Sequence, residues 1–235
     1  MTKKIVAAYS ISVALLLVSI WCGISIGSVS VPISTIWDAE SNPTAYSILW
    51  NIRMPRVILA ALVGAALAIA GAAFQGLLKN PLADPYTLGI SSGASVGAVF
   101  TLFFGVSLPV FGFFTLPIFS MIGAFVTLVV VMGFARLVDR TMKMETLILT
   151  GIIFSSFLGS CISLMIALTG EELRSIMGWL LGSVSMRGWP YVKMILPFVI
   201  IGALILWLHR RELNAMIYGE ERAKYLGVDV KRSKY

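Results

Sequence analysis

Long apolar stretches recur along this 235-residue chain, and they restrict its possible folds more than any other feature. A helix needs about 20 consecutive apolar residues to cross a bilayer. Six stretches have about that length, near Ile5–Ile26, Arg56–Leu78, Leu88–Leu108, Gly112–Leu137, Thr146–Thr169 and Tyr191–His209. Only 12% of the residues are charged, against about a quarter in soluble domains. The sequence therefore predicts an all-α polytopic membrane protein with about six transmembrane helices, its membrane domain ending at residue 209.

Two of the predicted spans have distinguishing features. The first follows Lys3 and Lys4, as a signal peptide would, but its apolar run exceeds the about 7–15 residues of a signal peptide's apolar region. We therefore expect it to be a retained span. The fourth is long and contains Pro117, so we expect it to be tilted or kinked.

The basic residues predict the orientation, because cytoplasmic segments of membrane proteins are enriched in Lys and Arg. With a cytoplasmic N-terminus, 13 basic residues fall inside and 5 outside. The outside set is Arg53, Arg56, Arg174, Arg187 and Lys193. This topology accounts for the net charge of +7, so no nucleic-acid partner is needed to explain it. We expect a multi-pass protein of the plasma membrane whose N-terminus is cytoplasmic.

Ionisable side chains are nearly absent from the depth of the spans. A charged group there costs roughly 2.5–3.5 kcal/mol and usually marks an ion or proton relay. Their scarcity argues against a secondary transporter or channel, which remains one alternative. A membrane enzyme is a second alternative, but His209 is the only histidine, and Cys22 and Cys161 lie far apart in apolar runs. We expect no metal site, no cofactor and no catalytic residues.

The stretch N-P-L-A-D-P, residues 80–85, interrupts the apolar pattern between the second and third spans. Each proline lacks an amide donor and disfavours helical geometry at the residue before it. Residues 80–85 must therefore form a short irregular connection. Irregular backbone at membrane depth persists only where it is buried in protein or lines water. By charge it lies on the cytoplasmic side, where an ordinary loop is the alternative to a functional one.

Small residues follow helical spacing on both sides of this connection, as helices that pack closely in membranes do. The six positions are Gly64, Ala68, Gly71, Gly89, Gly93 and Gly97. We expect them to serve helix packing. Gln75 is open to two interpretations, a hydrogen bond between helices or a residue of a transport pathway.

The C-terminal segment, residues 210–235, differs from the spans in being charged. Residues 211–218 can form two helical turns before Gly219, and residues 220–226 can form another short helix before Gly227. Two short helices joined by glycine form a compact knob. A helix resting on lipid headgroups is the alternative.

Four motifs in register resemble the FecCD-type permeases, the BtuC-like membrane subunits of ABC importers for iron–siderophore, haem and cobalamin. The motifs are R-M-P-R (53–56), L-V-G-A-A-L-A-I-A-G-A-A-F-Q (62–75), N-P-L-A-D-P (80–85) and L-G-I-S-S-G-A (88–94). The segment Y-G-E-E-R-A-K-Y-L-G-V (218–228) is similar to the cytoplasmic coupling segment of that family.

The resemblance implies roles for particular residues. Arg53 and Arg56 would dock the substrate-binding protein, although interfacial snorkelling is the ordinary role of an arginine at a span end. A cytoplasmic gate would contain Asn80, Pro81 and Leu82, faced by Met144, Glu145 and Thr146. Residues of the C-terminal segment would contact the ATPase, namely Gly219, Glu220, Ala223, Leu226 and Gly227.

The resemblance also implies partners. These are two copies of an ABC ATPase subunit, an extracytoplasmic substrate-binding protein, and a second permease subunit, identical or related, in the lipid bilayer. The family has about ten spans, so about the last four would be missing here. Because the ATPase is a separate subunit in that family, we expect a permease subunit that itself hydrolyses no ATP. A truncated remnant or a partner-sequestering subunit is the third alternative. Ferric siderophores are the commonest cargo that the resemblance implies, ahead of haem and cobalamin.

Overall fold

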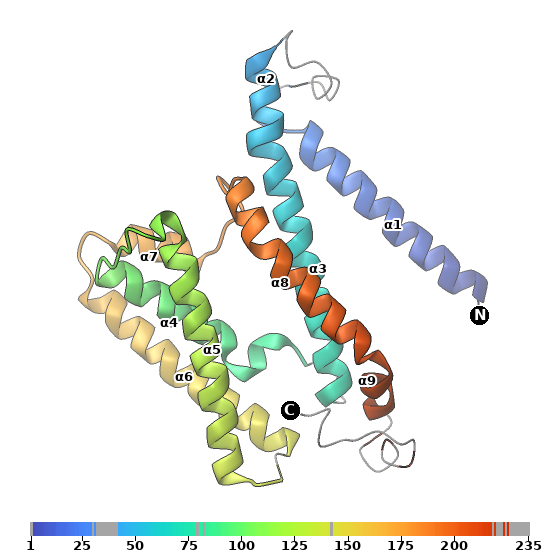
Figure 1. The fold of residues 1–235 in the computed structure, drawn as a ribbon, viewed down its shortest axis with the longest axis vertical. Coiled ribbons are helices and arrows are strands. Elements are labelled where there is room, and N and C mark those ends of the chain that lie inside the picture. The colour runs from blue at the N-terminus through green and yellow to red at the C-terminus, as the bar shows by residue number, and fades with distance from the viewer. Residues whose placement is uncertain are drawn as a thin grey trace. The chain divides into compact units, whose positions relative to one another are not determined.

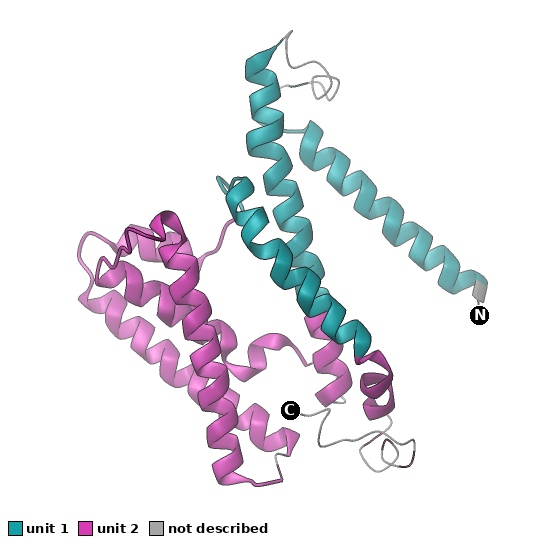
Figure 2. Cartoon of the chain, viewed as in Figure 1, with its two compact units in different colours: residues 1–68, 184–208 teal, residues 69–183, 209–235 magenta. Residues whose placement is uncertain are grey.

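The computed structural model describes residues 2–29, 31, 42–78, 80–81, 83–141, 143–217, 219, 223 and 225. Every regular element in these ranges is a helix, and the predicted all-α membrane class is confirmed (Figure 1). The chain divides into two compact units (Figure 2). Unit 1 comprises residues 1–68 and 184–208, and unit 2 comprises residues 69–183 and 209–235.

Five helices in the described part are long and apolar enough to cross a membrane. They lie at Lys3–Ser25, Pro43–Leu78, Gly112–Val138, Met144–Leu168 and Trp189–Leu208. The remaining predicted span is shorter than expected, because α4 covers only Ile90–Phe103, 14 residues. At 1.5 Å per residue it spans about 21 Å, less than the roughly 30 Å of a bilayer core.

Unit 1 contains three long helices and a helical extension. Its elements are α1 (Thr2–Ser25), α2 (Pro43–Ser47), the π-helix η2 (Ile48–Arg53), α3 (Met54–Leu78) as far as residue 68, and α8 (Trp189–Leu208). Asn42 begins the extension, because its side chain accepts a 3.0 Å hydrogen bond from the Ala45 amide. Large side chains of α1 such as Leu17, 61% exposed, cover its surface, as a lipid-facing helix requires.

The second span begins earlier than predicted. The sequence places its start at Arg56, whereas the helix runs without a break from Pro43. Pro55 does not end it, because the residues before it form a π-helix, and the carbonyl of Trp50 that the missing amide would leave without a partner accepts a hydrogen bond from Trp189. Arg53 and Arg56 thus lie within the helix and not outside it.

Unit 2 is built around α4, α5 and α6. Its other described elements are the end of α3, the 3-10 helices η3 (Pro85–Leu88) and η4 (Gly112–Phe114), α7 (Leu173–Leu180) and α9 (Arg210–Ile217). α5 covers Thr115–Val138 and α6 covers Met144–Leu168. Pro117 lies in the first turn of α5, where an amide has no partner within the helix. Its missing amide hydrogen therefore breaks no helical hydrogen bond and gives no reason for the kink that the sequence predicted.

The turn between α5 and α6 is held by Asp139. Its carboxylate accepts hydrogen bonds from the hydroxyl and amide of Thr141, at 2.7 and 2.9 Å, and from the Lys143 amide at 3.2 Å. The bond from the Thr141 hydroxyl, more than the others, holds the pKa of Asp139 below its usual value. This local cap sets where α6 begins.

Glycine allows α4 and α5 to approach to backbone contact. A Cβ atom at Gly93 would lie 2.0 Å from Oγ1 of Thr127 and 2.6 Å from the carbonyl oxygen of Gly123. One at Gly97 would lie 2.2 Å from the carbonyl oxygen of Phe119. Real Cβ atoms do not come so close, so only glycine fits this interface.

Candidate functional site

The connection at residues 80–85 is fastened to the end of α3. The side-chain amide of Gln75 donates a 2.9 Å hydrogen bond to the carbonyl oxygen of Pro81. The Asn80 amide donates to the carbonyl oxygen of Gln75 at 3.3 Å, and the Ala83 amide donates to that of Asn80 at 3.1 Å. Leu82 lies outside the described residues. The structure therefore gives Gln75 a hydrogen bond to the turn, and not the bond between helices that the sequence left open.

Downstream, Asp84 builds a short 3-10 helix. Its carboxylate accepts hydrogen bonds from the amides of Tyr86 and Thr87, at 2.8 and 3.1 Å. Gly89 then adopts φ +74°, a left-handed conformation that favours glycine, and α4 begins after it. α4 therefore begins only two residues after the predicted start of the third span at Leu88, and most of its shortening is at the other end, where it stops at Phe103 and not at Leu108.

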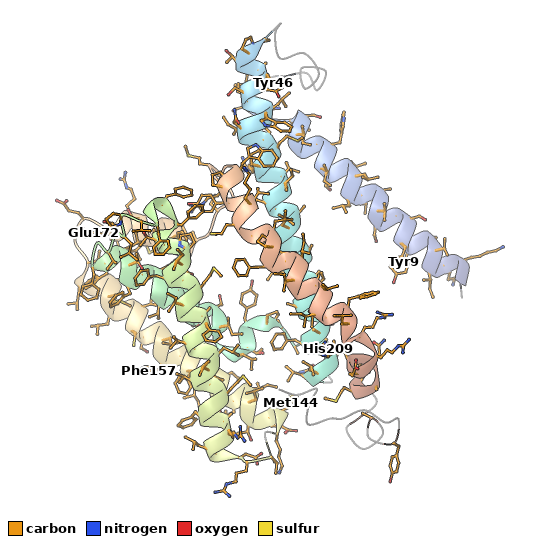
Figure 3. The ribbon with its side chains drawn as sticks, viewed as in Figure 1. Tyr9, Tyr46, Met144, Phe157, Glu172 and His209 are labelled. Carbon is orange, nitrogen blue, oxygen red and sulfur yellow. The ribbon has the colours of Figure 1, made fainter. Side chains whose placement is uncertain are left out.

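This irregular segment rests against α6. A Cβ atom at Gly151 would lie 2.3 Å from the carbonyl oxygen of Thr87, so α6 approaches η3 at backbone distance. Met144, Glu145 and Thr146 form the first turn of α6, two turns before Gly151 (Figure 3 labels Met144). Glu145 is exposed there, and its negative charge is stabilised by the positive N-terminal end of the helix dipole. The two expected groups of gate residues, 80–82 and 144–146, are therefore linked indirectly, through the contact of η3 with α6 at Gly151.

The two arginines of R-M-P-R differ sharply in environment. Arg53 is 7% exposed, and its guanidinium donates to the carbonyl oxygens of Ile24 at 2.9 Å, Ser25 at 2.8 Å and Val29. These carbonyls lie at and just beyond the C-terminal end of α1, where helical carbonyls have no partner within the helix. Docking from Arg53 would need an accessible guanidinium, and this one is occupied by its own chain.

Arg56, in contrast, is exposed. It lines a cavity of about 720 Å³ in unit 1 together with α1 residues such as Ile20 and α3 residues such as Val57. Arg53 also reaches this cavity, but its donors are directed to α1. The geometry therefore separates the pair that the sequence treated alike.

Gly64 and Gly71 of α3 meet no packing partner within the described part of the chain. A Cβ atom at Gly64 or Gly71 would meet nothing described within 4 Å, and Ala68 is exposed. That these three residues serve packing stays a prediction, because no described atom lies against Gly64 or Gly71. Gly89, Gly93 and Gly97 do face described neighbours.

The C-terminal segment begins as predicted with a short helix and a glycine. α9 ends at Ile217, and Gly219 adopts φ +107° while its amide donates to the Met216 carbonyl oxygen at 3.0 Å. The Ala223 amide donates to the Gly219 carbonyl oxygen at 2.9 Å. Met216 and Ala223 are fully buried against each other. Glu220, Leu226 and Gly227 lie outside the described residues.

Chemistry-bearing side chains do not gather in the described structure. No group of three His, Cys, Asp or Glu residues in it could hold a metal ion. Cys22 and Cys161 are free thiols, each half-buried. His209 lies between α8 and α9, at the junction of membrane helix and charged segment (Figure 3).

Sequence reasoning missed several residues that shape this site. Gly123 and Gly151 are contact points of α5 and α6, and the spacing of Gly151, Ser155 and Gly159 by four residues is a signal that could have found the second of them. Trp189 is another such residue, because its indole donates a hydrogen bond to the Trp50 carbonyl oxygen. The short helix α7 was also missed, although the amphipathic run around the buried Ile176 could have signalled it.

Comparison with known proteins identifies relatives along nearly the whole chain. The chain is 57% identical over 239 residues to the uncharacterized ABC transporter permease protein YvrB of Bacillus subtilis, covering 97% of this chain and 68% of that protein. It is 39% identical over 191 residues to the cobalamin import permease BtuC of Halobacterium salinarum, covering 81% and 50%. It is 34% identical over 218 residues to the hemin permease HmuU of Yersinia pestis, covering 89% and 63%.

A solved structure is also similar. It is described as a metal-chelate type ABC transporter in an inward-facing conformation, with a TM-score of 0.80 and 29% identity, covering 94% of this chain and 68% of that one. The chain thus spans from half to about two thirds of the length of these proteins. The family model described as the FecCD transport family matches residues 15–235. Because that match covers almost every residue, the chain belongs to the FecCD transport family.

Proposed function

We propose that this chain is the membrane-spanning permease part of an ABC importer that carries a metal chelate across the plasma membrane. The observation that carries the proposal is the 57% identity with an ABC transporter permease over 97% of the chain. The spanning helices supply the membrane path, and energy comes from a separate ATPase subunit. The scarcity of charge within the spans supports this division, because a carrier driven by ions would need coupling groups in its membrane helices.

The connection at residues 80–89 is the proposed cytoplasmic gate. α4 is too short to cross the bilayer alone, so part of the irregular backbone before or after it lies at membrane depth. The segment after α4 is apolar, whereas residues 80–89 contain Asn80 and Asp84, both exposed. Polar irregular backbone at that depth needs a water-filled path or protein around it. A substrate path beside this turn meets that need.

Two partners act on opposite faces in this proposal. The ATPase contacts the C-terminal segment from the cytoplasm, and its closure around ATP displaces that segment as a rigid body. The binding protein docks outside through Arg56, whose planar guanidinium pairs with carboxylates in a bidentate geometry. A second permease subunit completes the path, and the N-terminus is cytoplasmic, as the 13 to 5 distribution of basic residues favours.

The substrate is a ferric siderophore in the first instance, with haem and cobalamin as the alternatives. Permeases named for cobalamin, hemin and Fe(3+) dicitrate are among the relatives, and one is named for molybdate. The described residues form no metal-ligand cluster that would select one cargo. Selection is therefore assigned to the binding protein, and the path needs only to admit a bulky chelate.

Purification of the chain from its own membranes tests the class. We expect an ATPase subunit and a binding protein to purify with it, and uptake of radioactive iron as a siderophore chelate to require ATP. Uptake should continue when an ionophore collapses the proton gradient. Uptake that follows the proton gradient and ignores ATP would overturn the proposal in favour of a secondary transporter, as would the absence of any nucleotide-hydrolysing partner.

A further inference from the structure

The last turn of α3, residues 75–78, contacts two segments that the proposed function treats separately. One is the C-terminal segment that meets the ATPase, and the other is the turn at Asn80 and Pro81. All three belong to unit 2 (Figure 2). α9 lies beside this end of α3 (Figure 1).

The first contact is apolar. Met216 and Ala223 are fully buried, and Leu77 of α3 packs against them together with Ala215. The neighbouring Gly76 is buried, and a methyl group there would lie 3.6 Å from Cγ1 of Ile217, an ordinary contact distance. α9 and Ala223 are therefore packed on the last turn of α3 through side chains, so a displacement of α9 acts directly on this turn.

The second contact is polar and comes from Gln75. Its backbone carbonyl accepts from the Asn80 amide at 3.3 Å, and its side-chain amide donates to the Pro81 carbonyl at 2.9 Å. Two hydrogen bonds from one residue fix both the start of the turn and its proline. Pro81 has no amide hydrogen, so its carbonyl is the one backbone group by which this residue itself can be held.

We infer that the last turn of α3 transmits movement of the C-terminal segment to the cytoplasmic turn, with Gln75 as the positioning residue. This inference rests on the proposed function for what drives the movement. Leu77 takes up displacement of α9, and Gln75, two residues earlier on the same turn, passes it to Pro81. Gln75 thus acts through the turn and need not touch the substrate.

Gln75 has the required chemistry, and its closest analogues do not. A glutamate has the same length, but its carboxylate would face the Pro81 carbonyl oxygen without a donor. A leucine fills similar space and donates nothing. Gln75→Glu and Gln75→Leu should therefore release the turn while preserving α3, because both residues are good helix formers.

Hydrogen exchange on the purified chain in lipid nanodiscs tests the link without any transport partner. Gln75→Leu should speed exchange of the amides in residues 80–89 about fivefold, the effect of losing one hydrogen bond. Met216→Ala should also speed exchange in residues 80–89, although it lies on α9. Met216→Leu conserves volume and should restore the wild-type rates. Asn214→Ala is the matched control, because Asn214 is exposed on the same helix.

The outcomes separate the link from the proposed function. If Met216→Ala changes exchange only around α9, the last turn of α3 transmits nothing and the inference is overturned, whatever the protein transports. If exchange in residues 80–89 responds but no ATPase purifies with the chain, the link stands and the proposed driver is wrong. With the ATPase present, Gln75→Glu should lower the uptake per ATP hydrolysed at least threefold while hydrolysis continues. An unchanged ratio would overturn the positioning role.

Discussion

The indole Nε1 of Trp189 donates a 2.9 Å hydrogen bond to the backbone carbonyl of Trp50, 139 residues earlier in the chain. The π-helix makes this carbonyl available. In it the Met54 amide bonds the Leu49 carbonyl, five residues back, so the next donor in register would be Pro55. Proline has no amide hydrogen. The same residue that looked like a helix breaker thus creates the acceptor that ties α8 to η2.

Trp189→Phe should therefore destabilise unit 1. It removes the only group that the indole offers as a donor and leaves the Trp50 carbonyl unpaired, at a cost of about 1 kcal/mol. The tilted ring contact with Trp50, 5.3 Å between centroids, is largely kept. Thermal unfolding in nanodiscs measures the loss. Trp21→Phe on the exposed face of α1 is the control, and an equal effect there would contradict the assignment.

Arg53→Leu should act on stability and not on docking. Three carbonyls at and just beyond the end of α1 lose their donor. A hydrogen bond to a charged group contributes about 1.5–3 kcal/mol to stability, so we expect the free energy of unfolding to fall by about 2 kcal/mol. The measurement is the free energy of unfolding in mixed micelles. Docking of the binding protein to the variant that remains folded should be unchanged; a selective loss of docking would return Arg53 to the role that the resemblance implied.

Arg56→Glu should show the opposite pattern. The side chain is exposed, so its replacement leaves folding and membrane insertion intact, whereas a carboxylate there repels the acidic residues expected on the binding protein. Binding of the substrate-binding protein to the variant in nanodiscs, measured by surface plasmon resonance, should fall below detection. Lys193→Glu, exposed on α8, is the matched charge reversal. Docking that survives Arg56→Glu would remove this role from the proposal.

The class of fold follows from the sequence because a helix that crosses the bilayer needs about 20 consecutive apolar residues, and such runs are visible in the sequence. The lengths of Gly112–Val138 and Met144–Leu168 came out close to expectation for that reason. The shortening of α4 was not predicted, since the left-handed Gly89 before the helix and the left-handed Gly105 just after its end depend on local geometry that hydropathy does not record. The break at Asn80 and Pro81 was predictable because proline acts on its own backbone.

Side-chain partners across the chain were the least predictable part. Arg53 and Arg56 have the same chemistry and nearly the same position, and only the fold decides that Arg53 reaches the carbonyls of α1. Likewise, the spacing of Gly64 and Gly93 looks alike in sequence, but only Gly93 meets a neighbouring helix in the described structure. Spacing identifies a face that can pack, and the neighbour determines whether it does.

Glycine substitutions should separate these two faces. Gly93→Ala places a methyl group against Thr127 and the Gly123 backbone, so α4 and α5 must move apart, at a cost of about 3 kcal/mol or loss of the folded state. Gly64→Ala meets open space and should change the stability of this chain by at most about 1 kcal/mol, with a gain in helix propensity. Equal effects in thermal unfolding would contradict the observed packing of α4 on α5.

Gly219→Ala should weaken coupling more than it weakens the fold. Gly219 adopts φ +107°, a region that residues with a side chain rarely occupy, so alanine there costs about 1–3 kcal/mol of backbone strain. Relief of that strain would shift the Ala223 amide away from the Gly219 carbonyl and disturb the buried contact of Ala223 with Met216. Uptake per ATP hydrolysed, measured with the purified importer, should fall.

Gly182→Ala is the matched control, because Gly182 has φ +69° and meets no described atom within 4 Å of its Cβ position. It carries similar strain after α7, so it should lower stability and keep the ratio. A ratio that falls equally in both variants would attribute the effect to strain in general, and the C-terminal segment would lose its special role.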